Sequence, residues 1–238
     1  MLLSVNHVNY SYNPRAQVLH DVSFDIAENQ IIGLIGPNGS GKSTLIKIIL
    51  DLLKLQGGTV AIAGGGNQDR AAKMASIYLS SNDYLPEFLS GAEYLSFVHG
   101  LYGEKPDTAE VARQFERYSM RGRQGDLIED YSHGMRKKVQ LIAALMLKRP
   151  LTVIDETLNG VDLDAVFTFE TDVRELASGG RSVLLCSHDF SMLERTADEV
   201  MVLNMGALVS KSATSEILEV SGSLGSLARE LVQAMDVP

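Results

Sequence analysis

A glycine-rich segment early in the chain combines the residue types that bind a polyphosphate. It follows the apolar run 31–35 and precedes the apolar run 45–50, an order that predicts a buried strand, a tight turn and a helix. Glycines let the backbone point several N–H groups at one anion, and the start of the helix adds positive potential. The lysine adds a mobile cation, and the serine after it supplies a hydroxyl ligand for Mg²⁺. We therefore predict binding of a nucleoside triphosphate with Mg²⁺ by Gly36, Pro37, Asn38, Gly39, Ser40, Gly41, Lys42, Ser43 and Thr44.

Two neighbouring carboxylates follow a second apolar run. Asp155 and Glu156 come directly after residues 151–154, and the carboxyl ends of parallel strands are where open α/β sheets bind ligands. Taken alone, such a pair is more often the beginning of a helix. Downstream of a phosphate-binding loop it indicates a catalytic pair, in which Asp155 reaches Mg²⁺ and Glu156 polarises the attacking water as a general base.

Composition narrows the possible partners. The 238 residues carry a formal net charge of −9, so the chain lacks the basic character of nucleic-acid-binding proteins, and no nucleic-acid partner is expected. A single cysteine, Cys186, excludes an intrachain disulfide and fits a reducing compartment. The N-terminal residues do not resemble a signal peptide, and there is no run of about 18 apolar residues, so we expect another chain to make any membrane crossing.

A largely parallel sheet is needed to position these groups. The alternating first 27 residues predict two antiparallel strands with a turn at 13–15. Strands that alternate with helices later in the chain predict an α/β fold. The further strands are expected at 31–35, 57–63, 77–79, 151–154, 182–186, 200–203 and 207–209, helices of the last third at 165–176 and 191–195, and a hairpin turn at 204–206.

Between residues 87 and 149 the apolar period is that of helices, and the polar stretch 121–130 divides this block in two. Ser132 is expected to cap a helix over 134–148, which Pro150 ends. We expect a single domain over 1–238. Its predicted parts are a core formed by 1–86 and 150–238, an inserted helical subdomain at 87–149 and a C-terminal helical extension at 213–238.

Together, these motifs resemble the nucleotide-binding subunit of an ATP-binding cassette (ABC) transporter over essentially the whole chain. The segment 132–136, Ser-His-Gly-Met-Arg, is similar to the family signature in its exporter-type form. Residues 159–162 resemble the segment that contacts the opposite subunit, His188 the switch histidine, and Tyr12 the aromatic residue that stacks on adenine. Each match is weak alone, but their order and spacing make the set specific.

The resemblance implies a phosphate-loop NTPase (RecA-like) core and an ATPase that works as a head-to-tail dimer, with Lys42, Glu156 and His188 as catalytic residues. ATP would close this chain on a second copy or a paralogous subunit, and hydrolysis would reopen the pair. Integral membrane permease subunits would convert the cycle into transport, with export favoured and the chain at the cytoplasmic face of the cell membrane. The residues that would reach the opposite subunit's nucleotide are Ser132, Gly134, Met135 and Asp162.

The chain departs from the family pattern at three places. His133 replaces a glycine of the signature, and Thr157 and Leu158 stand where a proline and a threonine often follow the acids. The third departure is in the loop after residues 77–79. Ser81 stands where a glutamine normally contacts Mg²⁺ and the attacking water. Serine is shorter, so Ser81 or Asn82 would act through a bridging water, and we expect an active but slow ATPase. Two alternatives stay open: a soluble cassette ATPase acting on nucleic acid or the ribosome, and a regulatory module that hydrolyses ATP weakly.

Two apolar sets lie outside these motifs. Residues 224–235 carry a helical apolar stripe, which we expect to pack on its own domain, with a dimer or partner contact as the alternative. Four aromatic residues fall near the loop that docks the membrane subunit in the family, and we expect most of them to be core and one or two to line the docking groove. They are Tyr84, Phe88, Tyr94 and Phe97.

Overall fold

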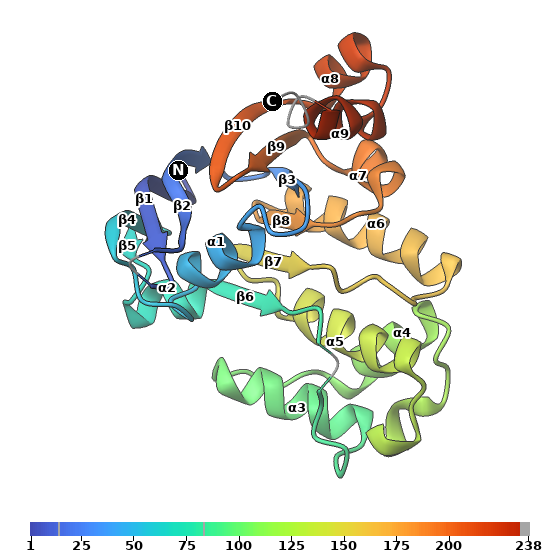
Figure 1. Ribbon diagram of the computed structural model, residues 1–238. Helices are drawn as coiled ribbons and strands as arrows, with labels where there is room; N and C mark the ends of the chain where they lie inside the picture. Colours follow the sequence, from blue (N-terminus) through green and yellow to red (C-terminus); the bar gives the residue numbers. More distant parts are fainter. Residues whose placement is uncertain (14, 83, 234–238) are drawn as a thin grey trace.

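The computed structural model describes residues 1–13, 15–82 and 84–233, which form two sheets and their covering helices (Figure 1). The first sheet is antiparallel, in the order β2-β1-β4-β5. Its strands are β1 (Leu3–Ser11), β2 (Gln17–Ile26), β4 (Gly57–Ile62) and β5 (Gly65–Gly66). The predicted turn at 13–15 includes residue 14, which lies outside the described residues. Strand β4 continues into β5 as a hairpin, because Ala63 and Gly64 both adopt positive φ in a two-residue turn.

The second sheet confirms the predicted α/β fold. Its order is β10-β9-β3-β8-β7-β6, with five parallel strands and β10 antiparallel at one edge. The predicted hairpin at 204–206 joins β9 to β10. The strands are β3 (Ile31–Ile35), β6 (Ser76–Leu79), β7 (Leu151–Asp155), β8 (Ser182–Cys186), β9 (Glu199–Asn204) and β10 (Ala207–Ala213).

Both faces of the central strands are buried, which explains their continuous apolar sequences. Successive side chains of a strand point to opposite faces, so Ile32 and Leu34 join the core shared with the antiparallel sheet, whereas Ile31 and Ile35 join the core on the other face. Helix α1 (Lys42–Ile49) fills the first of these cores and lies between the two sheets (Figure 1). The parallel sheet is therefore an interior layer. We call the side on which Ile32 and Leu34 contact the core of α1 the α1 face.

The helical block contains three α-helices, not two. The expected break at 121–130 is present as two short 3₁₀ turns, η1 (Arg123–Gly125) and η2 (Ile128–Asp130). A further break at 102–107 was missed; Gly103 adopts φ 72° there, a left-handed conformation that ends the helix before it. The three helices are α3 (Gly91–Leu101), α4 (Thr108–Arg117) and α5 (His133–Leu147).

Most of the four aromatic residues predicted to be core are instead exposed. The exposed fractions are 89% for Tyr84, 79% for Phe88 and 52% for Phe97, and Tyr94 is half-buried. Phe97 lies on the outer face of α3, whose buried side is formed by Gly91, Leu95 and His99.

The remaining helices pack against the two sheets and against one another. In α9, Leu224 is buried and Leu227 packs against the larger core, in agreement with the expected packing on its own domain; side chains from residue 231 onward lie outside the description. Among the described residues, no helix is both long and apolar enough to cross a membrane. These helices are α2 (Arg70–Ala75), α6 (Leu163–Ser178), α7 (Phe190–Thr196), α8 (Thr214–Ser221) and α9 (Leu224–Gln233).

Candidate functional site

The parallel sheet brings the sequence-predicted groups to one edge. β3 ends at the glycine-rich loop, β7 ends at Asp155, and β8 lies between them. Cys186, the last residue of β8, is in register with Leu34 on one side and Asp155 on the other. Parallel neighbours in register point to the same face, so the side chains of Cys186 and Asp155 are adjacent on the α1 face.

The loop after β3 depends on glycine. At Gly36, with φ 155°, an added Cβ would lie 2.0 Å from the carbonyl oxygen of Leu203. At Gly41, with φ 102°, it would lie 2.8 Å from the Leu19 side chain. Gly41 precedes α1 without a side-chain cap, so the first N–H groups of the helix point into the loop. This is the geometry of an anion-binding turn.

Lys42 is folded back into the loop. Its ammonium Nζ donates hydrogen bonds to the carbonyl oxygens of Gly36 (2.8 Å) and Pro37 (3.1 Å), and the residue is buried. Ser43 is exposed at the mouth of the loop. A phosphate at the loop would offer Lys42 a stronger, charge-assisted partner than these two carbonyls.

Tyr12 lies beside the same loop. Its hydroxyl is 3.1 Å from Oγ1 of Thr44, and its ring meets that of Tyr10 edge to face, with centroids 5.1 Å apart. More than half of Tyr12 (56%) remains exposed. An aromatic face next to a phosphate-binding loop is available for stacking on a base.

Asp155 has one anchored oxygen and one open one. The hydroxyl of Tyr78 donates to Oδ2 (3.2 Å), whereas Oδ1 is buried without a hydrogen-bond partner among the described residues. Burial and the Asp155 carboxylate raise the pKa of the Tyr78 hydroxyl, so it stays a proton donor. A buried carboxylate oxygen without a partner fits a hard cation such as Mg²⁺, with the Ser43 hydroxyl as a second ligand.

Glu156 and His188 form a pair across the ends of β7 and β8. Nε2 of His188 lies 2.8 Å from Oε1 of Glu156, and the Glu156 amide donates to the Cys186 carbonyl (2.9 Å). Glu156 adopts φ 53°, a left-handed conformation rare for a residue with a side chain. Such outliers are often found at functional sites.

Ser81 is exposed on the loop after β6, where it offers only a short hydroxyl. This loop is tied to α5: Lys137 Nζ donates to the Ser81 carbonyl oxygen, and Gln140 Nε2 donates to that of Asn82 (3.1 Å). The side chains that make these contacts project from the helix that Ser132 begins. The two segments are therefore connected within one chain.

The segment 132–136 begins α5 as predicted. Ser132 is its N-cap and accepts a hydrogen bond from the Met135 amide (3.2 Å). An added Cβ on Gly134 would lie 2.9 Å from the Gly160 carbonyl oxygen, so this glycine allows close packing of residues 159–162.

Asp162 is held by groups of its own chain. It caps α6, accepting from the Ala165 amide (3.1 Å), and forms an ion pair with the buried Lys138. Partial burial raises the pKa of Asp162, but the hydrogen bonds and charge of Lys138 and the Ala165 amide lower it overall. Asp162 therefore stays ionised.

Sequence reasoning missed two residues of the site, Tyr78 and Cys186. Tyr78 lies three residues before Ser81, and Cys186 directly precedes the Ser-His pair that contains His188. The only available signal was the alternation of side chains along each strand. It predicts the face of the sheet on which a side chain lies, but not the residue that it contacts.

Comparison with known proteins decides the family. The family model described as "ABC transporter" matches residues 19–159, which include the phosphate-binding loop, the segment 132–136 and both acids. The chain belongs to the ABC transporter family. It is an ABC-type ATP-binding subunit and an ATPase.

Similar proteins support this membership along nearly the whole chain. The ABC-type transporter ATP-binding protein EcsA of Bacillus subtilis is 31% identical, covering 93% of this chain and 91% of that protein. An uncharacterized ABC transporter ATP-binding protein of Nostoc, all4389, is 30% identical over 91% of this chain, which spans 66% of that relative's length. A solved structure, the ATP binding subunit of an ABC transporter, has a TM-score of 0.88 and 29% identity, covering 98% of this chain and 100% of that one.

Proposed function

We propose that the chain binds and hydrolyses Mg-ATP in a head-to-tail dimer and thereby powers transport, in the export direction, through separate membrane permease subunits. The observation that carries the proposal is the Asp155 carboxylate, which has one oxygen bonded by Tyr78 and one without a partner among the described residues. It lies next to the Glu156–His188 pair, at the same edge of the sheet as the phosphate-binding loop. A hard-cation ligand, a general base and a polyphosphate cradle at one sheet edge are the parts of phosphoryl transfer to water.

Each residue has a defined task in this proposal. The amides of residues 36–44 and the Lys42 ammonium bind the phosphates, and Tyr12 stacks on adenine. Bound Mg²⁺, held by Ser43 and Asp155, would neutralise charge on the outer phosphates. Glu156 accepts a proton from the attacking water, and His188 orients Glu156 through its 2.8 Å contact.

In this proposal each nucleotide is bound by residues of two subunits, so hydrolysis requires a dimer. The N-cap of α5, formed by Ser132 with Gly134 and Met135, supplies N–H groups and the positive end of a helix dipole. We propose that these groups bind the γ-phosphate held by the opposite subunit, with Asp162 at the same contact. The opposite subunit is a second copy or a paralogue.

A groove between β6, α3 and α5 is the proposed docking site for the permease. It encloses about 320 Å³, and the exposed side chain of Leu101 is part of its lining. Exposed apolar side chains around a groove favour a protein contact. The chain would then lie at the cytoplasmic face of the membrane, held there by its partner. Export is proposed from the resemblance of 132–136 to exporter-type signatures.

Glu156→Gln tests the catalytic and dimer proposals together. It removes the base but keeps the side-chain shape, so turnover should fall at least about a hundredfold while ATP is still bound. The variant should then elute as a dimer in size-exclusion chromatography with ATP and as a monomer without it. The double variant Lys42→Ala/Glu156→Gln is the control and should stay monomeric. Unchanged turnover, or a monomer at saturating ATP, would contradict the proposal.

The permease proposal has its own test. A polytopic membrane protein encoded beside this chain should co-purify with it from detergent extract. Leu101→Ser, at an exposed lining residue, should reduce that co-purification while the ATPase activity of the chain remains. Equal recovery with Leu101→Ser would remove the groove from the contact.

A further inference from the structure

The candidate catalytic site contains a thiol in addition to its carboxylates. Ligand atoms of Asp155, Glu156 and Cys186 all lie within 4.8 Å of one another. Next to them, Nε2 of His188 lies 2.8 Å from Oε1 of Glu156. Thiolate sulfur, imidazole nitrogen and carboxylate oxygen form the donor set that Zn²⁺ and similar soft cations take with four ligands.

The arrangement follows from the sheet. Cys186 and Asp155 are register partners at the ends of β8 and β7, with both side chains on the α1 face. Both are buried, whereas Glu156 and His188 are partly exposed. A cation can therefore enter past Glu156 and His188 and reach Cys186 and Asp155 behind them.

A second observation points to a cation here. Oδ1 of Asp155 is buried and has no hydrogen-bond partner among the described residues, although Asp155 is only 4% exposed. An uncompensated carboxylate oxygen at this depth costs free energy until a cation or donor reaches it. The thiol adjacent to it makes the same position suitable for a softer ion than Mg²⁺.

The required movement is small. Zinc–ligand distances of about 2.0–2.3 Å place tetrahedral donors about 3.5 Å apart. The donor atoms of Asp155, Glu156 and Cys186, now within 4.8 Å of one another, need to approach by about 1 Å. The Glu156 side chain, which is partly exposed, can rotate to supply this. His188 lies outside this group of three and adjoins it through its 2.8 Å contact with Glu156.

We propose that Cys186, Asp155 and Glu156, with His188 as the fourth donor, form an inhibitory site for a soft divalent cation of the zinc and cadmium class. On binding, Cys186 Sγ coordinates the ion and its proton passes to solvent. The ion occupies the open Asp155 oxygen and holds Glu156 as a ligand. Binding of the cation requires only these donor atoms. The inhibition also rests on the proposed function, in which Asp155 binds Mg²⁺ and Glu156 is the base.

The single cysteine of the chain makes the test specific. Cadmium added to the nucleotide-free protein should produce a sulfur-to-cadmium charge-transfer band at one equivalent, and only Cys186 can be its source. Cys186→Ser, which keeps a small polar side chain, should abolish the band and weaken zinc binding, measured against a chromophoric chelator, at least about tenfold. Zinc inhibition of Mg-ATP turnover, normalised to each variant's own uninhibited rate, should weaken by the same factor.

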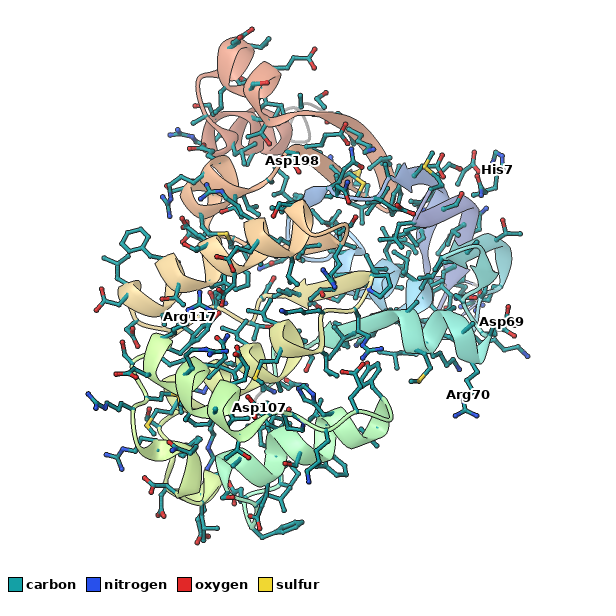
Figure 2. All side chains as sticks on the ribbon, turned by 180° about the vertical axis from the view of Figure 1, so that it is seen from behind. His7, Asp69, Arg70, Asp107, Arg117 and Asp198 are labelled. Atoms are coloured by element: carbon teal, nitrogen blue, oxygen red, sulfur yellow. The ribbon has the colours of Figure 1, made fainter. Side chains whose placement is uncertain are left out.

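His7→Ala is the matched control for adventitious binding. His7 of β1 forms an exposed pair with Asp21 of β2 (2.7 Å) and lies at the periphery of the molecule (Figure 2), so its loss should leave the cadmium band and the inhibition unchanged. Absence of the band in the wild-type protein, or equal zinc inhibition in Cys186→Ser, would overturn the inference. A wild-type protein that hydrolyses Mg-ATP without showing the band contradicts this proposal alone. A wild-type protein that fails to bind Mg-ATP in the absence of zinc and cadmium contradicts the proposed function.

Discussion

Nε2 of His188 lies 2.8 Å from Oε1 of Glu156, so the two residues assigned to the chemistry are directly paired. Glu156 has a left-handed backbone conformation, and its amide donates a hydrogen bond to the Cys186 carbonyl oxygen. Together these turn its side chain towards β8. His188 follows β8 by two residues, on the adjacent loop. The orientation of Glu156, the proposed base, therefore depends on the register between β7 and β8.

His188→Ala should lower turnover more than it lowers ATP binding. Without the imidazole, Glu156 loses the contact that orients it, and a positioned general base contributes about 10²–10⁴ in rate. We expect kcat to fall about a hundredfold, with the ATP dissociation constant within about threefold of wild type. Steady-state kinetics and calorimetry measure the two quantities. His7→Ala, at an exposed histidine, should change neither.

Lys42→Ala should weaken ATP binding. The Lys42 ammonium is the buried cation of the loop and now bonds only carbonyl oxygens among the described residues. A charge-assisted hydrogen bond contributes about 1.5–3 kcal/mol, which corresponds to an affinity loss of about 10–100-fold. Calorimetry with Mg-ATP measures it, and Lys47→Ala, on the exposed side of α1, is the control. Undiminished affinity of Lys42→Ala would count against the phosphate-loop assignment.

Tyr78→Phe should weaken metal binding, so a higher metal concentration is needed to saturate the site. The hydroxyl anchors Oδ2 of Asp155, which leaves Oδ1 for the cation. Loss of one hydrogen bond to a charged group should weaken metal binding about tenfold. Paramagnetic resonance of bound Mn²⁺ in the presence of ATP measures metal affinity directly. Tyr102→Phe removes a hydroxyl that bonds the Ser76 carbonyl instead and should leave the metal affinity unchanged.

Asp172→Ala should destabilise the contact between the helical block and the sheet core. Arg117 of α4 reaches α6 (Figure 2), where Asp172 accepts from Arg117 and from the fully buried Tyr118 hydroxyl (2.8 Å). Removing the shared acceptor leaves the Tyr118 hydroxyl unpaired and removes the ion pair of Arg117, which keeps its hydrogen bond to Gln114, at a cost of about 3 kcal/mol. Urea denaturation measures the loss. Glu116→Ala breaks the exposed pair with Arg121 and should cost less than about 0.5 kcal/mol.

The local sequence predicted much of the fold and most of the candidate site. Periods of two and 3.6 residues placed the parallel strands and α5, because they reflect which side chains meet the core. The break at 102–107 and the two-residue strand β5 were missed, since each depends on one or two positive-φ residues that composition does not reveal. The burial of the aromatic residues near α3 was predicted wrongly, because a helix face is apolar both when it packs inside and when a partner covers it.

By itself, the sequence determined the chemistry available to this protein: a glycine loop for phosphates, an acid pair after a strand, and the order of motifs that the family shares. Only the tertiary structure decided which groups meet. Tyr78, Asp155 and Cys186 are separated by 31 residues or more, and their contact depends on strand order and register. Hydrogen bonds between strand backbones look alike in any register, so the choice is made by packing of the whole sheet.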